Sequence, residues 1–564
     1  MQFLLSISET INSWFIYKEG EPILFTTLYF WGFFALVLSF YSVLYKRNTA
    51  RTIFLLLVSF FFYYKTSGLF LALLLFTIAS DYLWGGLIHR EKEIWKKKIY
   101  VSISLFLNLF FLCFFKYAWF FTDSYNQLMQ TDVKAVNIFA QFINQQAGTH
   151  FEIGMLIVPA GVSFFTFQSI SYVVDMYRGK IEPVRSVYDY GFFVCFFPHL
   201  VAGPIVKAKE FIHQIYQPYQ LSRFDFGMAV FWIMNGFGKK ILGDYVAVNF
   251  IDRVFANTQL YSGVECILSV FAYSFQVYAD FSGYTDIAIG VALLLGFRLK
   301  TNFNSPYKAA STSEFWQRWH ISLSSWLKEY LYIPLGGNRE GTMASYVVIG
   351  LMAGVVCLLS GNWWLPVLIT LFLSALIIWL LTVLFPTFKK SVNTNINLMI
   401  TMLLGGFWHG SSWMFITWGG LNGLGLILHK FWERINPFSA ISSKWFYRAI
   451  MVFVTLTFIS FTRIWFRVGS IKGGSWDNVK MFFDRMAHHM GGDLFWNVVW
   501  GYKQVMLVMI IGYLIHWIPE NYKEKYRIGF ANLPLPAMGA LIVVIVFCLY
   551  QMMGLMQPFI YFQF

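Results

Sequence analysis

The stretch Ile23–Tyr45 reads ILFTTLYFWGFFALVLSFYSVLY and contains no charged residue. It is long enough to cross a bilayer as a helix, which takes about 20 mostly apolar residues. Further apolar runs follow at Ile99–Phe121, Met228–Phe250, Val264–Phe297 and Trp364–Phe385. Their repetition predicts an all-α, polytopic membrane protein.

The composition excludes the other large classes of protein. Hydrophobic residues make up 58% of the 564 residues and charged residues 12%, whereas a typical soluble chain is about 25% charged. The 63 Phe, 22 Trp and 32 Tyr exceed the needs of one soluble core of this length. A soluble enzyme, a disordered chain and a collagen-like or coiled-coil rod are therefore excluded.

The net charge of +14 is interpreted as loop charge that orients the chain in a membrane. Nucleic-acid binding needs a solvated basic face, which so apolar a chain does not offer. Two apolar runs, Thr52–Tyr64 and Leu69–Gly86, are flanked by basic clusters. The clusters are Lys46, Arg47 and Arg51 on one side, and Arg90, Lys92, Lys96, Lys97 and Lys98 on the other. With both clusters in the cytoplasm, the runs form an out-and-back pair and the N-terminus lies outside.

The five cysteines indicate neither a disulfide framework nor a metal site. None forms a CxxC pair, and each lies singly in an apolar run; they are Cys113, Cys195, Cys266, Cys357 and Cys548. Met1–Ser13 lacks the basic region of a cleavable signal peptide, so none is expected.

About eleven membrane spans are expected from the length criterion. Some apolar segments are too short for a full span. Others, such as Leu398–Leu428, are long enough to be broken or re-entrant. No fixed-period repeat or composition shift divides the chain, so residues 1–564 are expected to form one integral-membrane domain.

Four stretches place polar groups at bilayer depth, where they are costly and therefore functional by default. They are Pro159–Arg178, Phe197–Pro204, Tyr278–Asp286, and Asn302–Arg339 with the later Gly405–Gly410. Their Pro and Gly residues free backbone groups that lipid cannot satisfy. The four stretches are therefore expected to line an internal cavity.

His320 lies within a predicted amphipathic helix, Ser313–Tyr332. Apolar residues recur there at three and four positions and form one stripe, on which His320 falls; they are Trp316, Trp319, Leu323, Trp326, Leu327 and Tyr330. Ser311 or Ser313 is expected to cap the helix. Because it is amphipathic, the helix is expected at an interface or dipping into a cavity.

His409 is the second histidine of interest. Its neighbours Gly405, Gly406 and Gly410 let another chain or a ligand approach the imidazole closely. Neutral imidazole is well matched to proton transfer near pH 7. A structural role with satisfied hydrogen bonds is the alternative for either histidine.

Other polar residues are given structural interpretations. His199 is expected to be structural. His488 and His489 lie in a polar loop, where surface exposure is favoured over metal binding. Asp280 and Asp286 form an ion-coupling pair or hold hydrogen bonds around the cavity, and the second is favoured.

Together these stretches resemble the membrane-bound O-acyltransferases. The motifs are Asn304-Ser-Pro-Tyr307, Glu314-Phe-Trp-Gln-Arg-Trp-His320, Tyr330-Leu-Tyr-Ile-Pro-Leu-Gly-Gly-Asn-Arg339 and Gly406-Phe-Trp-His409-Gly410. Within the family, the chain looks most like the bacterial alginate O-acetylation branch, which is similar to the D-alanyl transfer protein of teichoic acid modification. The matching motifs lie in residues 153–425, and residues 426–564 match weakly.

The resemblance implies a helical bundle around a central funnel or tunnel in a bacterial inner membrane. It implies transfer of an acyl group, acetyl in this branch, from a cytoplasmic acetyl-CoA or acyl-carrier thioester to an extracytoplasmic hydroxyl. No bound cofactor or metal is implied. The acceptor is a partner acetyltransferase protein that relays the group, or an exported glycan itself.

The family's histidine pair corresponds to His320 and His409. We expect His409 to be the general base, with His320 as its orienting partner or as an oxyanion stabiliser. Arg318, Lys328 and Arg339 are candidates to meet anionic donor groups at the cytoplasmic mouth, or else are charges that snorkel to water.

Two other functions compete with acyl transfer. The first is a transporter or flippase for a polysaccharide or lipid-linked sugar. Such proteins often show inverted repeats, and no internal repeat is visible in this sequence. The second is a non-catalytic scaffold for an extracellular-facing acetyltransferase.

Overall fold

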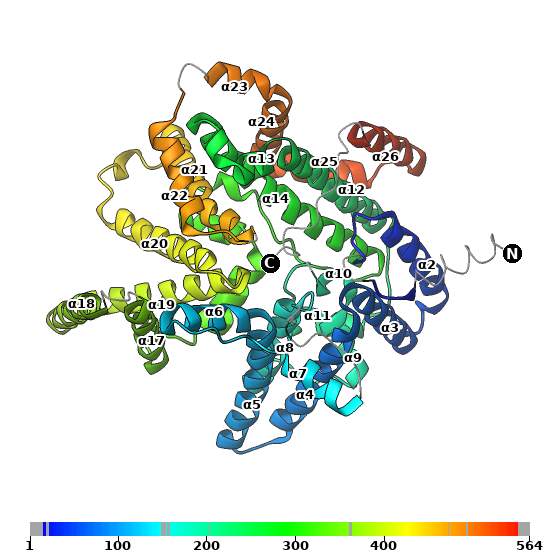
Figure 1. Ribbon diagram of the computed structural model, residues 1–564. Helices are drawn as coiled ribbons and strands as arrows, with labels where there is room; N and C mark the ends of the chain where they lie inside the picture. Colours follow the sequence, from blue (N-terminus) through cyan, green and yellow to red (C-terminus); the bar gives the residue numbers. More distant parts are fainter. Residues whose placement is uncertain are drawn as a thin grey trace.

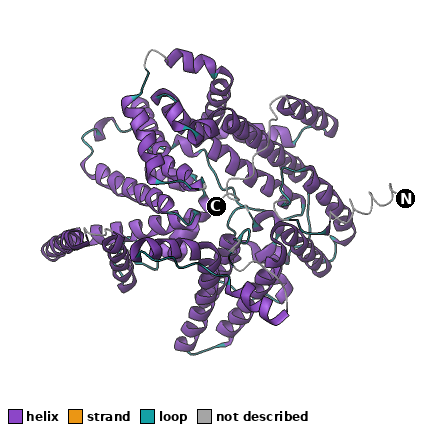
Figure 2. Cartoon of the chain, in the orientation of Figure 1, coloured by secondary structure: helices purple, strands orange, loops and turns teal. Residues whose placement is uncertain are grey.

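The computed structural model consists of helices joined by loops (Figures 1 and 2), with no strand in the residues it describes. These are residues 15–18, 22–147, 154, 158–201, 203–359, 364–471, 473–491 and 495–550. The expected all-α fold is confirmed. It suits an apolar environment, because a helix satisfies its backbone hydrogen bonds within its own segment.

For description, the helices are divided in chain order into an N-terminal, a central and a C-terminal group. The first group comprises α2 (Leu28–Leu44), α3 (Asn48–Ser67), α4 (Leu71–Arg90), α5 (Ile94–Leu112), α6 (Ala118–Met129), α7 (Ile138–Ala147), α8 (Val162–Tyr177), α9 (Val187–Cys195), α10 (Phe197–Leu200) and α11 (Ala208–Ile215). The second comprises α12 (Arg223–Val246), α13 (Asp252–Ala256), α14 (Gly263–Leu294), α15 (Thr312–Arg318), α16 (Ile321–Leu327), α17 (Met343–Leu359), α18 (Trp364–Leu384) and α19 (Pro386–His409). The third comprises α20 (Trp413–Ile435), α21 (Trp445–Ser470), α22 (Trp476–His488), α23 (Phe495–Gly501), α24 (Lys503–Trp517), α25 (Glu520–Ala531) and α26 (Leu535–Tyr550). Two π-helical turns that bear on the site are η2 (Cys113–Tyr117) and η6 (Lys328–Tyr332).

The described residues contain 4 helical stretches that are long and apolar enough to cross a membrane. They are Asn48–Arg90, Ile94–Met129, Leu365–Leu384 and Trp445–Ser470. The number rises to 6 if α23 with α24 and α25 with α26 each form one bent span. A multi-pass membrane protein is therefore supported, whereas the number of about eleven spans stays a prediction.

The first of these stretches turns back on itself at Gly68, whose φ of +58° is open mainly to glycine. The helices α3 and α4 on either side then pack on α9 at the same depth. A Cβ added at Gly191 would lie 3.3 Å from Leu56 of α3 and 3.4 Å from Ile78 of α4. The chain therefore reverses direction between α3 and α4, whereas the expected out-and-back crossing of the membrane stays a prediction.

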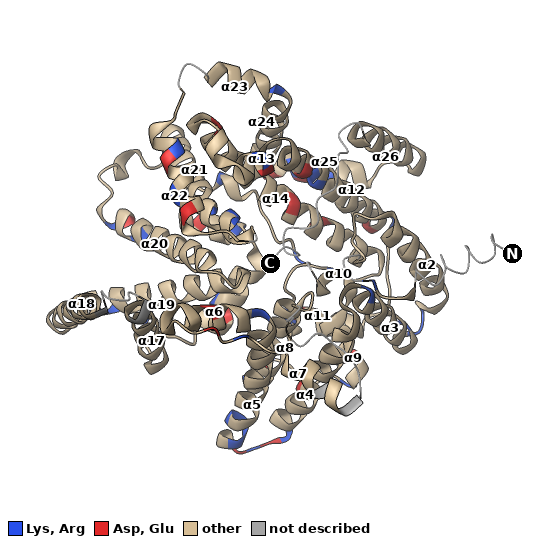
Figure 3. Ribbon diagram, viewed as in Figure 1, with Lys and Arg blue, Asp and Glu red and all other residues tan. Residues whose placement is uncertain are grey.

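The helix α18 projects from the rest of the bundle (Figure 1), and the apolar window within Leu365–Leu384 is 0% buried. Most of the ribbon is coloured as uncharged, and Lys and Arg are visible at a few places, among them the connection between α4 and α5 (Figure 3). So large an exposed apolar surface is typical of a lipid-facing or interaction surface.

The long helices α12 and α14 pack closely at the centre of the molecule. A Cβ added at Gly236 would lie only 2.4 Å from the carbonyl oxygen of Gly283, so small residues permit this approach. Lys239 pairs with Asp286 at 2.6 Å across the same interface. Asp280 similarly lies 2.8 Å from the ammonium of Lys240. Both aspartates therefore bind lysines of the neighbouring helix, which is the structural role that was favoured for them.

The prediction of one continuous helix over Ser313–Tyr332 is wrong. The chain forms α15, breaks at Trp319 and His320, resumes as α16 and ends in η6. Ser311 caps α15, because its Oγ accepts the N–H of Glu314 at 3.0 Å. The apolar spacing is the same on both sides of the break, so the periodicity did not reveal it.

Candidate active site

His320 occupies the break between α15 and α16. Its backbone is left-handed, with φ 43° and ψ 55°, and its side chain is fully buried. This conformation costs a non-glycine residue about 1–2 kcal/mol, although histidine adopts it more often than most. The surrounding contacts therefore hold His320 against a local preference, and such strain clusters at functional sites.

Asn302 holds both the backbone and the ring at this break. Its carbonyl accepts the N–H of Ile321 at 2.9 Å, and its Oδ1 accepts the N–H and the hydroxyl of Ser322 at 3.0 Å and 2.9 Å. The Nδ1 atom of His320 lies 3.3 Å from the same oxygen. Because an amide oxygen only accepts, Nδ1 carries the proton, and Nε2 of the neutral ring is an acceptor.

His409 is the last residue of α19, and its side chain is buried. The rings of Trp408, Trp418 and Phe466 surround it, with centroid distances of 5.0 Å, 5.1 Å and 5.4 Å. The helix ends directly after it, at Gly410, before α20 begins. The expected break in the long segment Leu398–Leu428 is therefore present, and it leaves the imidazole at a helix end in an aromatic pocket.

The fold brings the two histidines together, although they are far apart in sequence. Their ring centroids are 6.4 Å apart with an interplanar angle of 63°. Trp408 contacts both rings, since its centroid is 6.1 Å from that of His320. In such a low-dielectric site, hydrogen bonds are electrostatically stronger than in water. The arrangement suits acid–base chemistry on a group that contacts both imidazoles.

Trp418 supplies a hydrogen-bond donor beside His409. Its side chain is buried, and its Nε1 atom has no hydrogen-bond partner among the residues that the structure describes. An unsatisfied buried donor costs about 1–3 kcal/mol, and a buried Trp N–H usually finds a partner. A substrate atom in the site is therefore a candidate partner for this N–H group.

Two residues of the π-turn η2 clamp the last turn of α19. Lys116 donates to the carbonyl of Trp408 at 2.7 Å and to that of His409 at 3.3 Å. The hydroxyl of Tyr117 donates to the carbonyl of Phe407 at 3.0 Å. These bonds satisfy helix-end carbonyls that have no intrahelical partner, and a cation is favourable at this end of the helix dipole. The clamp fixes the backbone that carries His409.

This clamp was not predicted from the sequence. Lys116 lies in the run Ile99–Phe121, which was interpreted only as a span. The available signal was a lysine at bilayer depth, which is costly and usually functional. A π-turn within a helix is likewise frequent at functional sites. The partners of Lys116 lie 292 and 293 residues away, so the sequence alone could not identify them.

The glycines beside His409 admit the neighbouring helix α20. A Cβ added at Gly406 would lie 2.3 Å from the carbonyl oxygen of Phe415 and 2.9 Å from the Cα of Gly419. A Cβ at Gly410 would lie 2.1 Å from the ring of Phe415. The expected close approach of another part of the chain is present, and it fixes the end of α19 against α20.

Arg463 of α21 supports the residue that precedes His320. Its guanidinium carbon lies 4.2 Å from the ring centroid of Trp319. It also donates to the carbonyl of Ser274 at 3.0 Å and to the hydroxyl of Tyr307. This buried cation links α14 and α21 to the break between α15 and α16.

The three basic residues suggested for donor binding lie in different surroundings. Arg318 is paired with Glu314 at 2.9 Å and donates to the carbonyl of Asn304 at 3.1 Å. Lys328 and Arg339 are exposed. A separate cluster of lysines around Glu329 was not predicted from the sequence.

The remaining candidates lie outside the histidine pair. The ring Nε2 of His199 lies 2.9 Å from the carbonyl oxygen of Phe193, and the ring is buried. His488 and His489 are exposed and lie 2.9 Å and 3.7 Å from Asp484. Within the described part of the chain, no group of three or more His, Cys, Asp or Glu side chains could hold a metal ion.

A family comparison matches the centre of the chain. The profile of the membrane-bound O-acyltransferase family matches residues 185–395. This region includes α12, α14 and His320, whereas His409 lies beyond its end.

Comparisons with individual proteins extend over more of the chain. A probable alginate O-acetylase of Pseudomonas putida is 34% identical over 414 residues, which are 72% of this chain and 70% of that protein. A peptidoglycan O-acetyltransferase of Helicobacter pylori is 30% identical over 456 residues, 76% of this chain and 73% of that protein. A teichoic acid D-alanyltransferase of Streptococcus thermophilus is 26% identical over 282 residues, 49% of this chain and 57% of that protein.

Proposed function

The chain belongs to the membrane-bound O-acyltransferase family, and from this premise we propose that it transfers an acetyl group to a hydroxyl of an extracytoplasmic glycan. The observation that carries the proposal is the buried pair of imidazoles, 6.4 Å apart between ring centroids. A membrane location and O-acyltransferase activity follow from the family. The acyl group, the acceptor and the roles of residues are the proposed parts.

The relatives favour acetyl and a glycan. The alginate O-acetylase and the peptidoglycan O-acetyltransferase each match more than two thirds of this chain at 30% identity or above. The D-alanyltransferase matches 49% of the chain at 26%. The first two names both state transfer of acetyl, and alginate and peptidoglycan are both glycans outside the cytoplasm. Acetyl is therefore favoured over D-alanyl.

In the proposed reaction, His409 acts as general base. It accepts the proton of the acceptor hydroxyl while the hydroxyl oxygen attacks the thioester carbonyl. The new C–O bond forms, the C–S bond breaks, and the proton passes to the leaving thiolate. The products are an O-acetyl ester and a free thiol. Positioned general-base catalysis of this kind contributes about 10²–10⁴ in rate.

The proton on His320 Nδ1 bears on the role of this residue. With Nε2 as an acceptor, the neutral ring cannot donate to an oxyanion, so an orienting role beside His409 is the better supported of the two. The indole N–H of Trp418 is the candidate donor to the oxyanion that forms on the thioester carbonyl.

The proposed partners are a thioester donor, membrane lipid and the acceptor. We place the basic clusters at Lys46–Arg51 and Arg90–Lys98 in the cytoplasm of a bacterial cell, so that the membrane is the inner one. The donor is then acetyl-CoA or an acyl-carrier thioester from the cytoplasm. The acceptor arrives from outside, either as the glycan or as a partner acetyltransferase that relays the group. Nucleic acid is not among the proposed partners.

The transporter is not favoured, because the matching family and relatives are acyltransferases. A flippase would also leave the buried imidazoles without a chemical role. The His409→Ala variant tests the scaffold alternative. Acetylation that depends on a pure scaffold should survive this substitution, because a scaffold needs no catalytic imidazole.

The test uses the purified protein in nanodiscs, supplied with radiolabelled acetyl-CoA and a glycan acceptor. We expect transfer of label to an ester that mild alkali releases. Mass spectrometry of exported glycans, from cells with and without the protein, identifies the acceptor. The proposed function would be contradicted if the purified protein formed no labelled ester and if cells with and without the protein exported glycans with the same degree of acetylation.

A further inference from the structure

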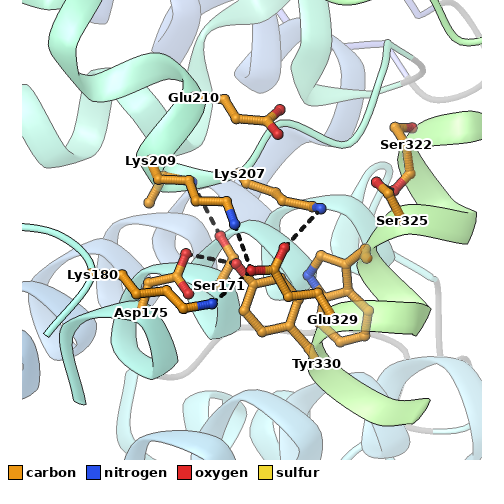
Figure 4. A network of polar contacts seen from close by, with 12 residues as sticks. Ser171, Asp175, Lys180, Lys207, Lys209, Glu210, Ser322, Ser325, Glu329 and Tyr330 are labelled. Carbon is orange, nitrogen blue, oxygen red and sulfur yellow. Dashed lines mark hydrogen bonds and ion pairs between the residues drawn. The ribbon is translucent and has the colours of Figure 1, made fainter. Parts of the chain in front are cut away.

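One carboxylate, Glu329 in η6, is surrounded by cations (Figure 4). The ammonium groups of Lys180, Lys207 and Lys209 lie 2.9 Å, 3.1 Å and 2.5 Å from its oxygens. Arg178 donates to the backbone carbonyl of Glu329 at 3.3 Å. Four cationic side chains, which follow α8 or begin α11, therefore converge on one residue.

The cations outnumber the carboxylates in this cluster. The nearby Asp175 accepts the hydroxyl of Tyr330 at 2.7 Å. Glu210 is paired elsewhere, with Lys300 at 2.8 Å. Partial burial raises the pKa of Glu329, but the bonds from three lysines outweigh this and hold the pKa at about 2. The carboxylate is ionised at neutral pH, and the cluster still carries surplus positive charge.

The cluster is open to water on one side. The side chain of Lys207 is 6% exposed, whereas those of Lys180 and Lys209 are 42% and 32% exposed. Lys207 is therefore buried behind Glu329, whereas Lys180 and Lys209 face the solvent. Ion pairs of partly exposed lysines contribute little each to stability, so replacing one of the two exposed lysines should leave the protein folded.

The same chain segment connects the cluster to the histidine pair. Glu329 follows His320 by nine positions, through α16 and into η6, which corresponds to roughly 13 Å of helical rise. The turn after α8 contacts the end of α4, because His89 and Glu182 are 4.0 Å apart. The cluster therefore lies on the side of the basic loops, which is the cytoplasmic side in the proposed orientation.

We propose that Lys180, Lys207 and Lys209, with Arg178, form a binding site for the phosphate groups of the thioester donor. This inference rests on the proposed function, because the donor is a thioester of a phosphopantetheine carrier. Glu329 holds the lysines in place in the absence of donor. When a phosphate binds, some of the lysines exchange their ion pair with Glu329 for one with the phosphate. The phosphate remains at the mouth while the flexible pantetheine arm extends along α16 toward His409.

The first experiment compares two donors in one kinetic assay. S-acetyl-pantetheine carries the same thioester as acetyl-CoA but has no phosphate. We expect Lys180→Met and Lys209→Met each to raise KM for acetyl-CoA by about tenfold. The kcat for acetyl-CoA and the KM for S-acetyl-pantetheine should stay unchanged. Lys300→Met, which removes an exposed lysine from a different ion pair, is the matched control and should change neither KM.

S-acetyl-phosphopantetheine identifies the phosphate that the site binds. Sensitivity of its KM to the lysine variants assigns the site to the phosphate shared by CoA and carrier proteins. Sensitivity confined to acetyl-CoA assigns it to the nucleotide phosphates. Equal effects of the lysine variants on S-acetyl-pantetheine and acetyl-CoA, or no effect on any donor, would overturn the proposal.

Glu329→Gln separates an anion site from a purely structural network. If Glu329 competes with phosphate, the variant should bind CoA more tightly than the parent, by about threefold to tenfold. If the network is only structural, CoA binding should weaken or stay the same, and the inference is wrong. Binding is measured by thermal shift with CoA in the His409→Ala background, so the result does not depend on catalysis. Loss of acetyl transfer with intact CoA binding would then count against the proposed function alone.

Discussion

At the scale of single residues, the site depends on backbone that other parts of the chain hold. His320 is kept left-handed by Asn302, and His409 sits on a helix end that Lys116 clamps. Neither support comes from a neighbour in sequence. Catalysis should therefore respond to residues that touch no substrate.

Lys116→Met tests the clamp. The substitution keeps the length of the side chain but removes the bonds to the carbonyls of Trp408 and His409. We expect kcat to fall about 10- to 100-fold, since bonds from a charged group are worth about 1.5–3 kcal/mol. The KM for the donor should change little. Lys65→Met is the matched control, because Lys65 is also buried but bonds to the carbonyl of Ile16. Equal losses in both variants would indicate general damage to the fold.

Trp418→Phe tests the proposed oxyanion donor. The variant keeps an aromatic ring beside His409 but loses the indole N–H together with the pyrrole ring, a loss of volume that the control below shares. Removal of one oxyanion donor typically costs about 10²–10³ in kcat, and we expect a loss of about 10²-fold with KM retained. Trp465→Phe is the control, because it also removes a buried N–H without a partner in the described residues, at a ring that packs on Phe483. Full activity of Trp418→Phe would exclude this role.

At the scale of elements, the crossing of α19 and α20 determines where His409 lies. Gly406→Ala should force the helices apart, because the new methyl group would meet the backbone of Phe415 and Gly419. Such overpacking costs about 1–3 kcal/mol, so we expect a lower melting temperature in detergent and reduced transfer. Gly405→Ala is the neighbouring control, since its methyl group would meet only the flexible side chain of Leu327, at 3.2 Å. Indistinguishable melting of the two variants would contradict the close-packing argument.

The ion pairs of Glu329 tie η6 to the segments after α8 and at α11. The pKa of Glu329 is about 2 in the folded protein, below about 4.3 for an unfolded glutamate. Because the pKa of Glu329 is lower in the folded protein, its ionised form stabilises the fold at pH values above the unfolded-state pKa of about 4.3. This stabilisation is lost as the pH falls from about 4.3 toward 2. Glu329→Gln should therefore melt below the parent at pH 7, and the difference should shrink through this window. A difference independent of pH would contradict the assignment.

The elements were predictable to different degrees. Apolar runs such as Met228–Phe250 and Trp364–Phe385 identify helices directly, because their length and composition suffice. The break at His320 was not predictable from spacing, since the stripe of Trp and Leu continues on both sides. Asn302 imposes this break from 18 residues upstream.

At the scale of the whole molecule, the bundle buries the two histidines next to each other in its interior. The polar stretches at bilayer depth predicted an internal site, and the fourth of them, Asn302–Arg339 with the later Gly405–Gly410, supplies both histidines. Their distance and the atom that carries the proton on His320 required coordinates. So did the basic cluster at Glu329, because its lysines come from two separate segments and meet only in the fold.

The most direct test of the central claim is the rate of acetyl transfer by purified His409→Ala, measured beside His488→Ala. The exposed His488 serves as a matched control for loss of a histidine. We predict that His409→Ala folds, retains CoA binding and loses about 10²–10⁴ in kcat, whereas His488→Ala keeps the parental rate. A folded His409→Ala protein that retains a large share of the parental rate would contradict the assignment of this imidazole as the general base.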